Sequence, residues 1–279
     1  MKIFTKLFKV MGIKIIKYQK YLKLVNSEKN YINNLQQSEN YKNLIKELII
    51  NNQNLKFKKI EIKSQNLQDL IVLDLFGFKN KGIFIEAGAC DGILNSNSYL
   101  LEKEFSWSGL LVEPLKDYFI ELKKNRKVNC ENYALYSDDS ENARFLMTDS
   151  NDLSTLKGFE NNDIHDENRK KNLEITVRTI TLTHLLDNLF FPKEIDFLSL
   201  DTEGSELEIL KDFNFEKYLI KVICVEHNQN KNRKLIQKYL EQKKYTRIDF
   251  PIIEIDDFYI HKSFNPKNKY FKFNSFQKS

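Results

Sequence analysis

One run of small and acidic residues has the composition of a ligand-binding turn. Residues 82–92 read GIFIEAGACDG, so an apolar stretch runs into Glu86, and Gly88, Asp91 and Gly92 follow before a helical pattern begins. Glycines at a tight turn between a strand and a helix let the backbone approach a ligand closely. The run is not the G-x-G-x-x-G fingerprint of dinucleotide-binding proteins, and an ordinary strand-to-helix turn would look much the same.

A second acid strengthens the ligand-binding interpretation. Glu113 ends the next apolar run, 21 residues after Gly92. In nucleotide-binding βαβ units, the acid at about this distance accepts hydrogen bonds from the two ribose hydroxyls. Glu86 would repel a pyrophosphate, but it suits a ligand that carries an ammonium and a sulfonium group. The pair therefore favours an adenosyl methyl donor, although Glu113 alone could be a strand-end acid in solvent.

A third group of residues could remove a proton. Asp201 and Glu203 end a further apolar run, and His227 follows the run after that. Methyl transfer to an alcohol requires a base, and histidine is the commonest one near neutral pH. We expect these three residues to be catalytic, with His227 as the base and a carboxylate orienting it, or with a carboxylate as the base. The two carboxylates could instead hold Mg²⁺, which would acidify the acceptor.

The other reactive residue types form no recognisable site. The three cysteines are odd in number and form no C-x-x-C pair, which argues against disulfides and a thiolate zinc site and favours a reducing compartment. We expect these cysteines to pack in the fold, and the histidines other than His227 to be structural. No D/N-P-P-Y/F tetrad and no Pro-Cys dipeptide occurs, so methylation of DNA bases has no support.

A mostly parallel sheet would bring these residues together. Apolar runs that end in an acid are typical of strands buried on both faces. We expect strands at residues 82–86, 109–113, 128–135, 195–201 and 219–226, additional strands at 142–147 and 173–180, and a closing antiparallel pair at 245–249 and 254–260. Helices are expected at residues 95–104, 114–125, 181–188, 205–213 and 232–243, and the fourth has capping-box spacing at its start. This alternation predicts a doubly wound α/β sheet with the ligand at the carboxyl ends of the strands.

Charge is distributed unevenly along the 279 residues. The net charge is +5, but residues 1–25 hold seven lysines and no acid, so the rest of the chain sums to −2. We therefore expect no nucleic-acid partner for the globular part. No stretch is apolar for 18 residues, and lysines interrupt any possible signal peptide, which predicts a cytoplasmic protein.

The N-terminal region is expected to be a helical extension over residues 1–58, separate from a domain over 59–279. Apolar residues recur at spacings of four and three between residues 4 and 25, which predicts a basic amphipathic helix over residues 2–25. Such a helix could pack on its own domain, form a coiled-coil seam or lie on an anionic membrane surface as a peripheral contact.

The order of several motifs resembles a known family. These motifs are SQNLQD (64–69), FIEAGACDG (84–92), SNSY (96–99), WSG and VEP (107–114), NYAL with Ser137-Asp138, LS (153–154), ITV (175–177), IDFLSLDTEGSELEIL (195–210) and VEHN (225–228). Over about residues 62–262 the sequence is similar to the FkbM family of S-adenosylmethionine-dependent methyltransferases. It departs at Leu67, where the family often has Gly, and at Ser98, where Thr is usual.

The resemblance implies a class I, Rossmann-like methyltransferase fold of seven strands with the last strand antiparallel. It implies that Glu86, Gly88, Asp91 and Gly92 bind the methionine side of S-adenosylmethionine, and that Asn97 also binds this cofactor. Glu113 would bind the ribose and Asp138 the adenine amino group, although Asp138 could equally be a turn residue.

The resemblance also points to O-methylation of a hydroxyl, on a sugar or glycan. The alternatives are a lipid or small-metabolite acceptor, and a binding protein that has kept the fold but lost catalysis. The intact set of acids argues against the second alternative. We expect residues 142–173 and the N-terminal region to build the acceptor pocket.

Overall fold

The computed structural model describes residues 61–149, 152–160, 168–229, 231–250, 255–269 and 274–275. The chain divides into two units, Met1–Asn52 and Gln53–Ser279, and the described residues belong to the second. The helix predicted at residues 2–25 and the domain boundary predicted after residue 58 lie outside the described residues and stay predictions. Within the described part, every helix is too short or too polar to cross a membrane.

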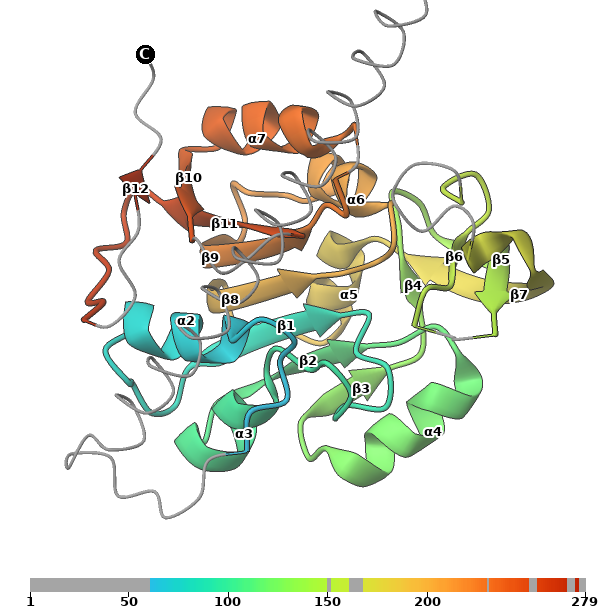
Figure 1. Cartoon of the computed structure of the whole chain (residues 1–279), viewed down its shortest axis with the longest axis horizontal. Coiled ribbons are helices and arrows are strands. Elements are labelled where there is room, and N and C mark those ends of the chain that lie inside the picture. The colour runs from blue at the N-terminus through green and yellow to red at the C-terminus, as the bar shows by residue number, and fades with distance from the viewer. Residues whose placement is uncertain are drawn as a thin grey trace, which may run out of the picture. The chain divides into compact units, whose positions relative to one another are not determined.

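The larger of the two sheets has the strand order β12-β10-β11-β9-β8-β1-β2-β3 (Figure 1). Its parallel strands are β1 (Ile83–Ala87), β2 (Ser108–Val112), β3 (Asn129–Glu131), β8 (Glu194–Leu200) and β9 (Leu219–Glu226). β11 (Asp256–His261) runs antiparallel to both β9 and β10 (Tyr245–Asp249), and β12 (Asn274–Ser275) adds two residues at the edge. Apart from this short addition, the sheet has the seven strands and the reversed strand of a class I methyltransferase, so the predicted fold is confirmed.

The strand order fixes where a ligand can bind. From β1 the chain moves outward through β2 and β3, and it later returns to the other side of β1 as β8. At the point where the strand order reverses, the connections that follow two adjacent parallel strands run to opposite sides, and a crevice opens at the carboxyl ends of these strands. Glu86, Gly88 and Asp201 lie at this point, at the ends of β1 and β8.

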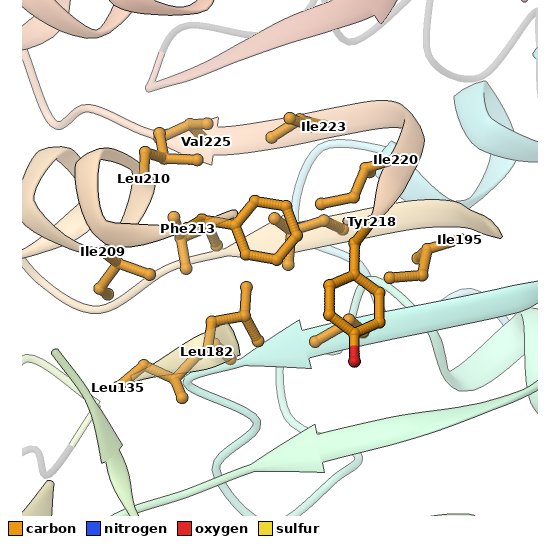
Figure 2. Packing of buried hydrophobic residues seen from close by; sticks show 14 of the residues in the cluster. Leu135, Leu182, Ile195, Ile209, Leu210, Phe213, Tyr218, Ile220, Ile223 and Val225 are labelled. Atoms are coloured by element: carbon orange, nitrogen blue, oxygen red, sulfur yellow. The ribbon is translucent and has the colours of Figure 1, made fainter. Parts of the chain in front are cut away.

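Helices pack against the faces of the large sheet and form apolar cores with its strands. They are α2 (Gln68–Leu75), α3 (Tyr99–Phe105), α4 (Lys116–Asn125), α5 (Leu182–Asn188), α6 (Glu206–Asp212) and α7 (Arg233–Gln242). Figure 2 shows the apolar cluster in which Leu182 of α5 and Leu210 of α6 pack with Ile223 and Val225 of β9. Because side chains alternate along a strand, Ile85 faces this cluster while the neighbouring Phe84 faces the other side.

A second, four-stranded sheet has the order β4-β7-β5-β6. Its strands are β4 (Ala134–Leu135), β5 (Ser140–Thr148), β6 (Thr155–Leu156) and β7 (Asn172–Ile180), and a short 3-10 turn, η1 (Asn168–Lys170), precedes β7. β5 and β7 correspond to the additional strands predicted at 142–147 and 173–180, and they pair antiparallel.

Three predicted elements differ from the structure. The strand predicted at 128–135 is split, because β3 pairs with β2 in the large sheet and β4 pairs with β7 in the small one. Between them, the Asn132 side chain donates to the carbonyls of Glu113 (2.8 Å) and Pro114 (2.9 Å). The helix predicted from residue 95 begins at Tyr99, after residues that bind Glu86. α6 begins where predicted, but Ser205 makes no side-chain cap; the Glu206 carboxylate instead accepts from the backbone N–H groups before the helix.

Candidate active site

A cavity of about 490 Å³ opens at the carboxyl ends of the parallel strands, a volume within the range of roughly 300–1,000 Å³ typical of small-molecule and cofactor sites. Its polar lining includes Gln65, Gln68, Glu86, Asn95, Asn97, Glu113, Asp152, Ser154, Ser199, Asp201, Thr202, Glu203, Ser205, Glu226 and Asp256. Its apolar lining includes Leu115, Tyr133, Ala134, Leu135, Phe145 and Leu156, so the small sheet supplies one wall. Among the described lining residues, seven are carboxylic acids and none is Lys, Arg or His.

Glu113, a residue of the cavity lining, connects two loops. Its Oε2 accepts a hydrogen bond from the backbone N–H of Cys90 (2.9 Å), and its Oε1 accepts one from that of Leu115 (2.8 Å). Burial raises the pKa of Glu113 to about 7, although these two bonds act in the opposite direction. Each oxygen has a further lone pair, so the carboxylate can accept from the two hydroxyls of a ribose.

Glu86 holds the loop that precedes α3. Its carboxylate accepts from the Ser96 hydroxyl (3.0 Å), the Asn97 backbone N–H (2.7 Å) and the Ser98 hydroxyl. The buried Arg126 guanidinium supports the same loop by donating to Ser96 Oγ (3.0 Å) and Ser98 Oγ (2.9 Å). Glu86 therefore lines the cavity as predicted, but most of its bonding capacity is used to shape the cavity wall.

Gly88 lets two strand ends approach each other. It has a φ of +77°, and a Cβ at this position would lie 1.8 Å from the backbone oxygen of Asp201. The Asp201 N–H donates to the Ala87 carbonyl (3.2 Å), which joins the end of β8 to that of β1. Gly88 thus places the Asp201 carboxyl in the cavity.

Asp91, Gly92 and Asp138, which were predicted to contact the donor, do not line the cavity. Asp91 Oδ1 accepts from the N–H groups of Ile93 (2.8 Å) and Leu94 (2.7 Å), so this side chain shapes the turn. A Cβ at Gly92 would lie 2.6 Å from Arg126 Cγ. Donor contacts by these three residues stay predictions that the cavity does not support.

Asn97 offers an acceptor to a cationic ligand. Its Nδ2 donates to Ser199 Oγ (2.9 Å), while its buried Oδ1 has no hydrogen-bond partner among the described residues. An unpaired buried acceptor costs free energy unless a ligand supplies a donor. The ammonium of S-adenosylmethionine would be such a donor.

Three carboxyl groups of the cavity lining lie close together. One oxygen each of Asp201, Glu203 and Glu226 lies within 4.8 Å of the others, and we call these residues the acidic cluster. The carboxyls of Asp201 and Glu226 are hydrogen-bonded to each other. Burial raises the pKa of both, that of Asp201 to about 7. Burial likewise raises the pKa of the neighbouring Asp256 to about 6, and this carboxylate accepts from Gln68 Nε2 (2.9 Å).

Glu203 is the most constrained member of the acidic cluster. It has a φ of +58°, and its Oε2 accepts from the buried Arg169 guanidinium and from Asn228 Nδ2 (3.3 Å). Arg169 Nε also donates to the Leu153 carbonyl (2.9 Å). η1 is thereby attached to the end of β8, and the Glu203 carboxylate is paired with a cation.

His227 lies near the acidic cluster in sequence but outside the cavity. Its Nδ1 accepts from the Gln229 N–H (3.0 Å), and its buried Nε2 lies 3.8 Å from Asp257 Oδ1. Burial lowers the pKa of His227 to about 4. The geometry does not favour the prediction that this imidazole takes the acceptor proton, because the side chain turns toward β11 and not toward the ligand space.

Sequence reasoning missed Gln68, Arg169, Glu226, Asn228 and Asp256. Glu226 could have been predicted from its position, since it is an acid at the end of β9, just as Glu113 follows β2 and Asp201 follows β8. Arg169 carried none, because it reaches Glu203 from a polar segment that precedes β7.

The cavity fits an adenosyl methyl donor. Apolar side chains of Leu115, Ala134, Phe145 and Leu156 can enclose a purine, the Glu113 carboxylate can accept from a ribose, and the acidic cluster suits positive charge. Fold and cavity together define a class I methyltransferase that uses an adenosyl methyl donor.

The family model described as the methyltransferase FkbM domain matches residues 86–246, more than half of the chain, and the chain belongs to this family. It is an S-adenosylmethionine-dependent methyltransferase. The predicted family and enzyme class are confirmed.

Solved structures show further likenesses. The chain is similar to precorrin-6y C5,15-methyltransferase from Geobacter metallireducens, with 12% identity and a TM-score of 0.38 over 73% of this chain and 90% of that one. It is also similar to human methyltransferase 10 domain containing protein, with 14% identity and a TM-score of 0.39 over 80% and 95% of the two chains. A SAM dependent methyltransferase from Aquifex aeolicus has 12% identity and a TM-score of 0.33 over 70% and 90%. No curated protein matches the sequence.

Proposed function

We propose that the enzyme methylates a hydroxyl group on a sugar or glycan. The observation that carries this proposal is the acidic cluster, because a hydroxyl needs a proton acceptor and the described cavity offers carboxyl groups for that role. S-adenosylmethionine supplies an electrophilic methyl group when bound. A lipid or a small metabolite with a hydroxyl is the alternative acceptor.

Asp201 is the group in this cluster that we assign as the proton acceptor. All three residues line the cavity, but Glu203 is paired with Arg169 and both Glu203 and Glu226 are buried, whereas Asp201 is half-buried. The hydrogen bond from Glu226 orients the Asp201 carboxyl. Asp201 therefore combines access to a ligand with a fixed direction.

The charge of the cavity limits the acceptor. Seven carboxylic acids line it, and the described lining contains no cationic side chain that could pair with a phosphate. The part of the acceptor next to the reacting hydroxyl is therefore neutral or cationic, which disfavours nucleic acids and sugar phosphates. Gln65, Gln68, Asn95 and Ser154 offer neutral polar groups of the kind that bind polyols.

The test uses labelled S-adenosylmethionine and a panel of neutral glycans, amino sugars, sugar phosphates and hydroxylated lipids. We expect transfer to a neutral or aminated sugar and an O-methyl product by NMR. Asp201→Asn should lower turnover by about 10²–10⁴ with unchanged affinity for S-adenosylhomocysteine. Glu208→Gln on the outer side of α6 is the matched control. Transfer only to lipids would select the alternative acceptor, and full activity of Asp201→Asn would refute the assigned base.

A further inference from the structure

We propose that the acidic cluster, together with Asn228, binds one divalent cation with a preference for oxygen ligands, such as Mg²⁺ or Mn²⁺. The catalytic role of this cation rests on the proposed function, but the evidence for the cation site does not. Oxygen atoms from three buried or half-buried carboxyl groups lie within 4.8 Å of one another, a separation that a single ion can bridge. Carboxylate and amide oxygens are the ligands that these cations prefer.

Asn228 is the second, independent observation. Its side chain is buried, and its Nδ2 lies 3.3 Å from Glu203 Oε2, so the amide group faces the acidic cluster. The Oδ1 of the same amide is buried and has no hydrogen-bond partner in the described part of the chain. Rotation about the last side-chain bond would exchange the two atoms, so the Nδ2–Glu203 hydrogen bond would be lost and the oxygen would face the carboxylates. A cation between these oxygens would stabilise that orientation.

The local charge matches a divalent ion. Asp201 and Glu226 share a proton in their hydrogen bond, and this proton would leave when a cation binds. The three carboxylates would then carry −3, and the Arg169 guanidinium that donates to Glu203 returns +1. The remaining charge of −2 equals that of the ion with opposite sign, and buried charge is tolerated only when it is paired. Arg169 thus reduces the negative charge of the site by one but does not take the place of the cation.

A cation here would polarise a hydroxyl that lies next to the acidic cluster. Metal coordination lowers the pKa of a bound oxygen. The Asp201 carboxyl would then receive a proton from a group that is already acidified. The cation would therefore assist the deprotonation that the proposed function requires. The two proposals share one site, but they are tested separately.

The experiment measures binding of Mn²⁺ to the full chain, followed by the loss of the electron paramagnetic resonance signal of the free ion. We expect one Mn²⁺ per chain in the micromolar to low millimolar range, with competition by Mg²⁺. Glu226→Gln and Asn228→Ala should each weaken binding at least about tenfold, and Asn228→Asp should strengthen it. Asp152→Asn removes a cavity carboxylate outside the cluster and should change little. Circular dichroism checks that each variant is folded.

Two outcomes would overturn the cation site. One is that no Mn²⁺ binds below several millimolar. The other is that Mn²⁺ binds equally to the wild type, Glu226→Gln, Asn228→Ala and Asn228→Asp, which would indicate adventitious surface sites. If hydroxyl methylation proceeds fully in the presence of a chelator while Mn²⁺ does not bind, the cation proposal fails and the proposed function stands. If Mn²⁺ binds as expected but no hydroxyl is methylated, the reverse holds.

Discussion

Glu113 allows a sharp test of the donor site through Glu113→Gln. The amide keeps the size of the side chain but replaces one carboxylate oxygen by a donor. Since both oxygens already accept from backbone N–H groups (2.8 and 2.9 Å), the replacement leaves one N–H facing another donor and removes one acceptor from the ribose. A hydrogen bond to a charged group contributes about 1.5–3 kcal/mol, so we expect affinity for S-adenosylhomocysteine to fall about 10- to 150-fold at pH 8.

The pH dependence gives this prediction a second readout. Burial raises the pKa of Glu113 to about 7, so the carboxyl is mostly protonated at pH 6 and ionised at pH 8. A ligand that binds the ionised form must displace that proton, and wild-type affinity should therefore rise with pH, by about tenfold between pH 6 and pH 8 from this group. Glu113→Gln lacks the group, so the ratio of the two affinities should be about tenfold larger at pH 8 than at pH 6.

Isothermal titration calorimetry with S-adenosylhomocysteine measures both effects, and the ratio cancels contributions from the ligand and from other acids. Glu131→Gln is the matched control, because Glu131 ends the neighbouring strand β3 outside the cavity lining. The ribose assignment would be refuted by equal affinities of wild type and Glu113→Gln, or by a ratio that does not change with pH.

Three other predictions concern the turn, the histidine and the N-terminal region. Gly88→Ala should destabilise the fold by at least about 3 kcal/mol in urea unfolding, because a Cβ at a φ of +77° would lie 1.8 Å from the Asp201 backbone oxygen; a loss below about 1 kcal/mol would show that the strand ends can separate freely. His227→Asn should keep turnover within about fivefold, because the imidazole lies outside the cavity; a loss of 10²–10⁴ would restore His227 as the base. Sedimentation with anionic vesicles should pellet the full chain more than one lacking residues 1–25, with an effect that salt reduces; equal pelleting would return this segment to a packing role.

The sheet could be predicted because its strands are buried on both faces. Continuous apolar runs located β1, β2, β8 and β9 to within one or two residues. The same reasoning failed at α2, whose eight residues are all buried, including Gln68, Asp69 and Asp74. A helix without a solvent face shows no amphipathic period, so the pattern gave no signal.

The site could be predicted in part, because the end of a strand places a residue at an edge but does not fix the direction of its side chain. Glu86, Gly88, Asn97 and Glu113 line the cavity, as do Asp201 and Glu203. His227 follows β9 on the same edge, yet its ring is held by Gln229 and faces Asp257. The Gln229 contact is local, but the Asp257 contact depends on the packing of β11 against β9, which spacing alone does not encode.

The buried Arg126 has a consequence for how the enzyme meets its donor. Its guanidinium donates to the Gly92 carbonyl, to Ser96 and Ser98, and to Glu102 (2.5 Å), so the loop before α3 is tied down by the protein's own groups. A wall that is already ordered loses little conformational entropy when a ligand arrives. Donor association should therefore require no rearrangement of this loop. The favourable free energy of the donor contacts should then appear in the measured affinity, because little of it is offset by ordering the loop.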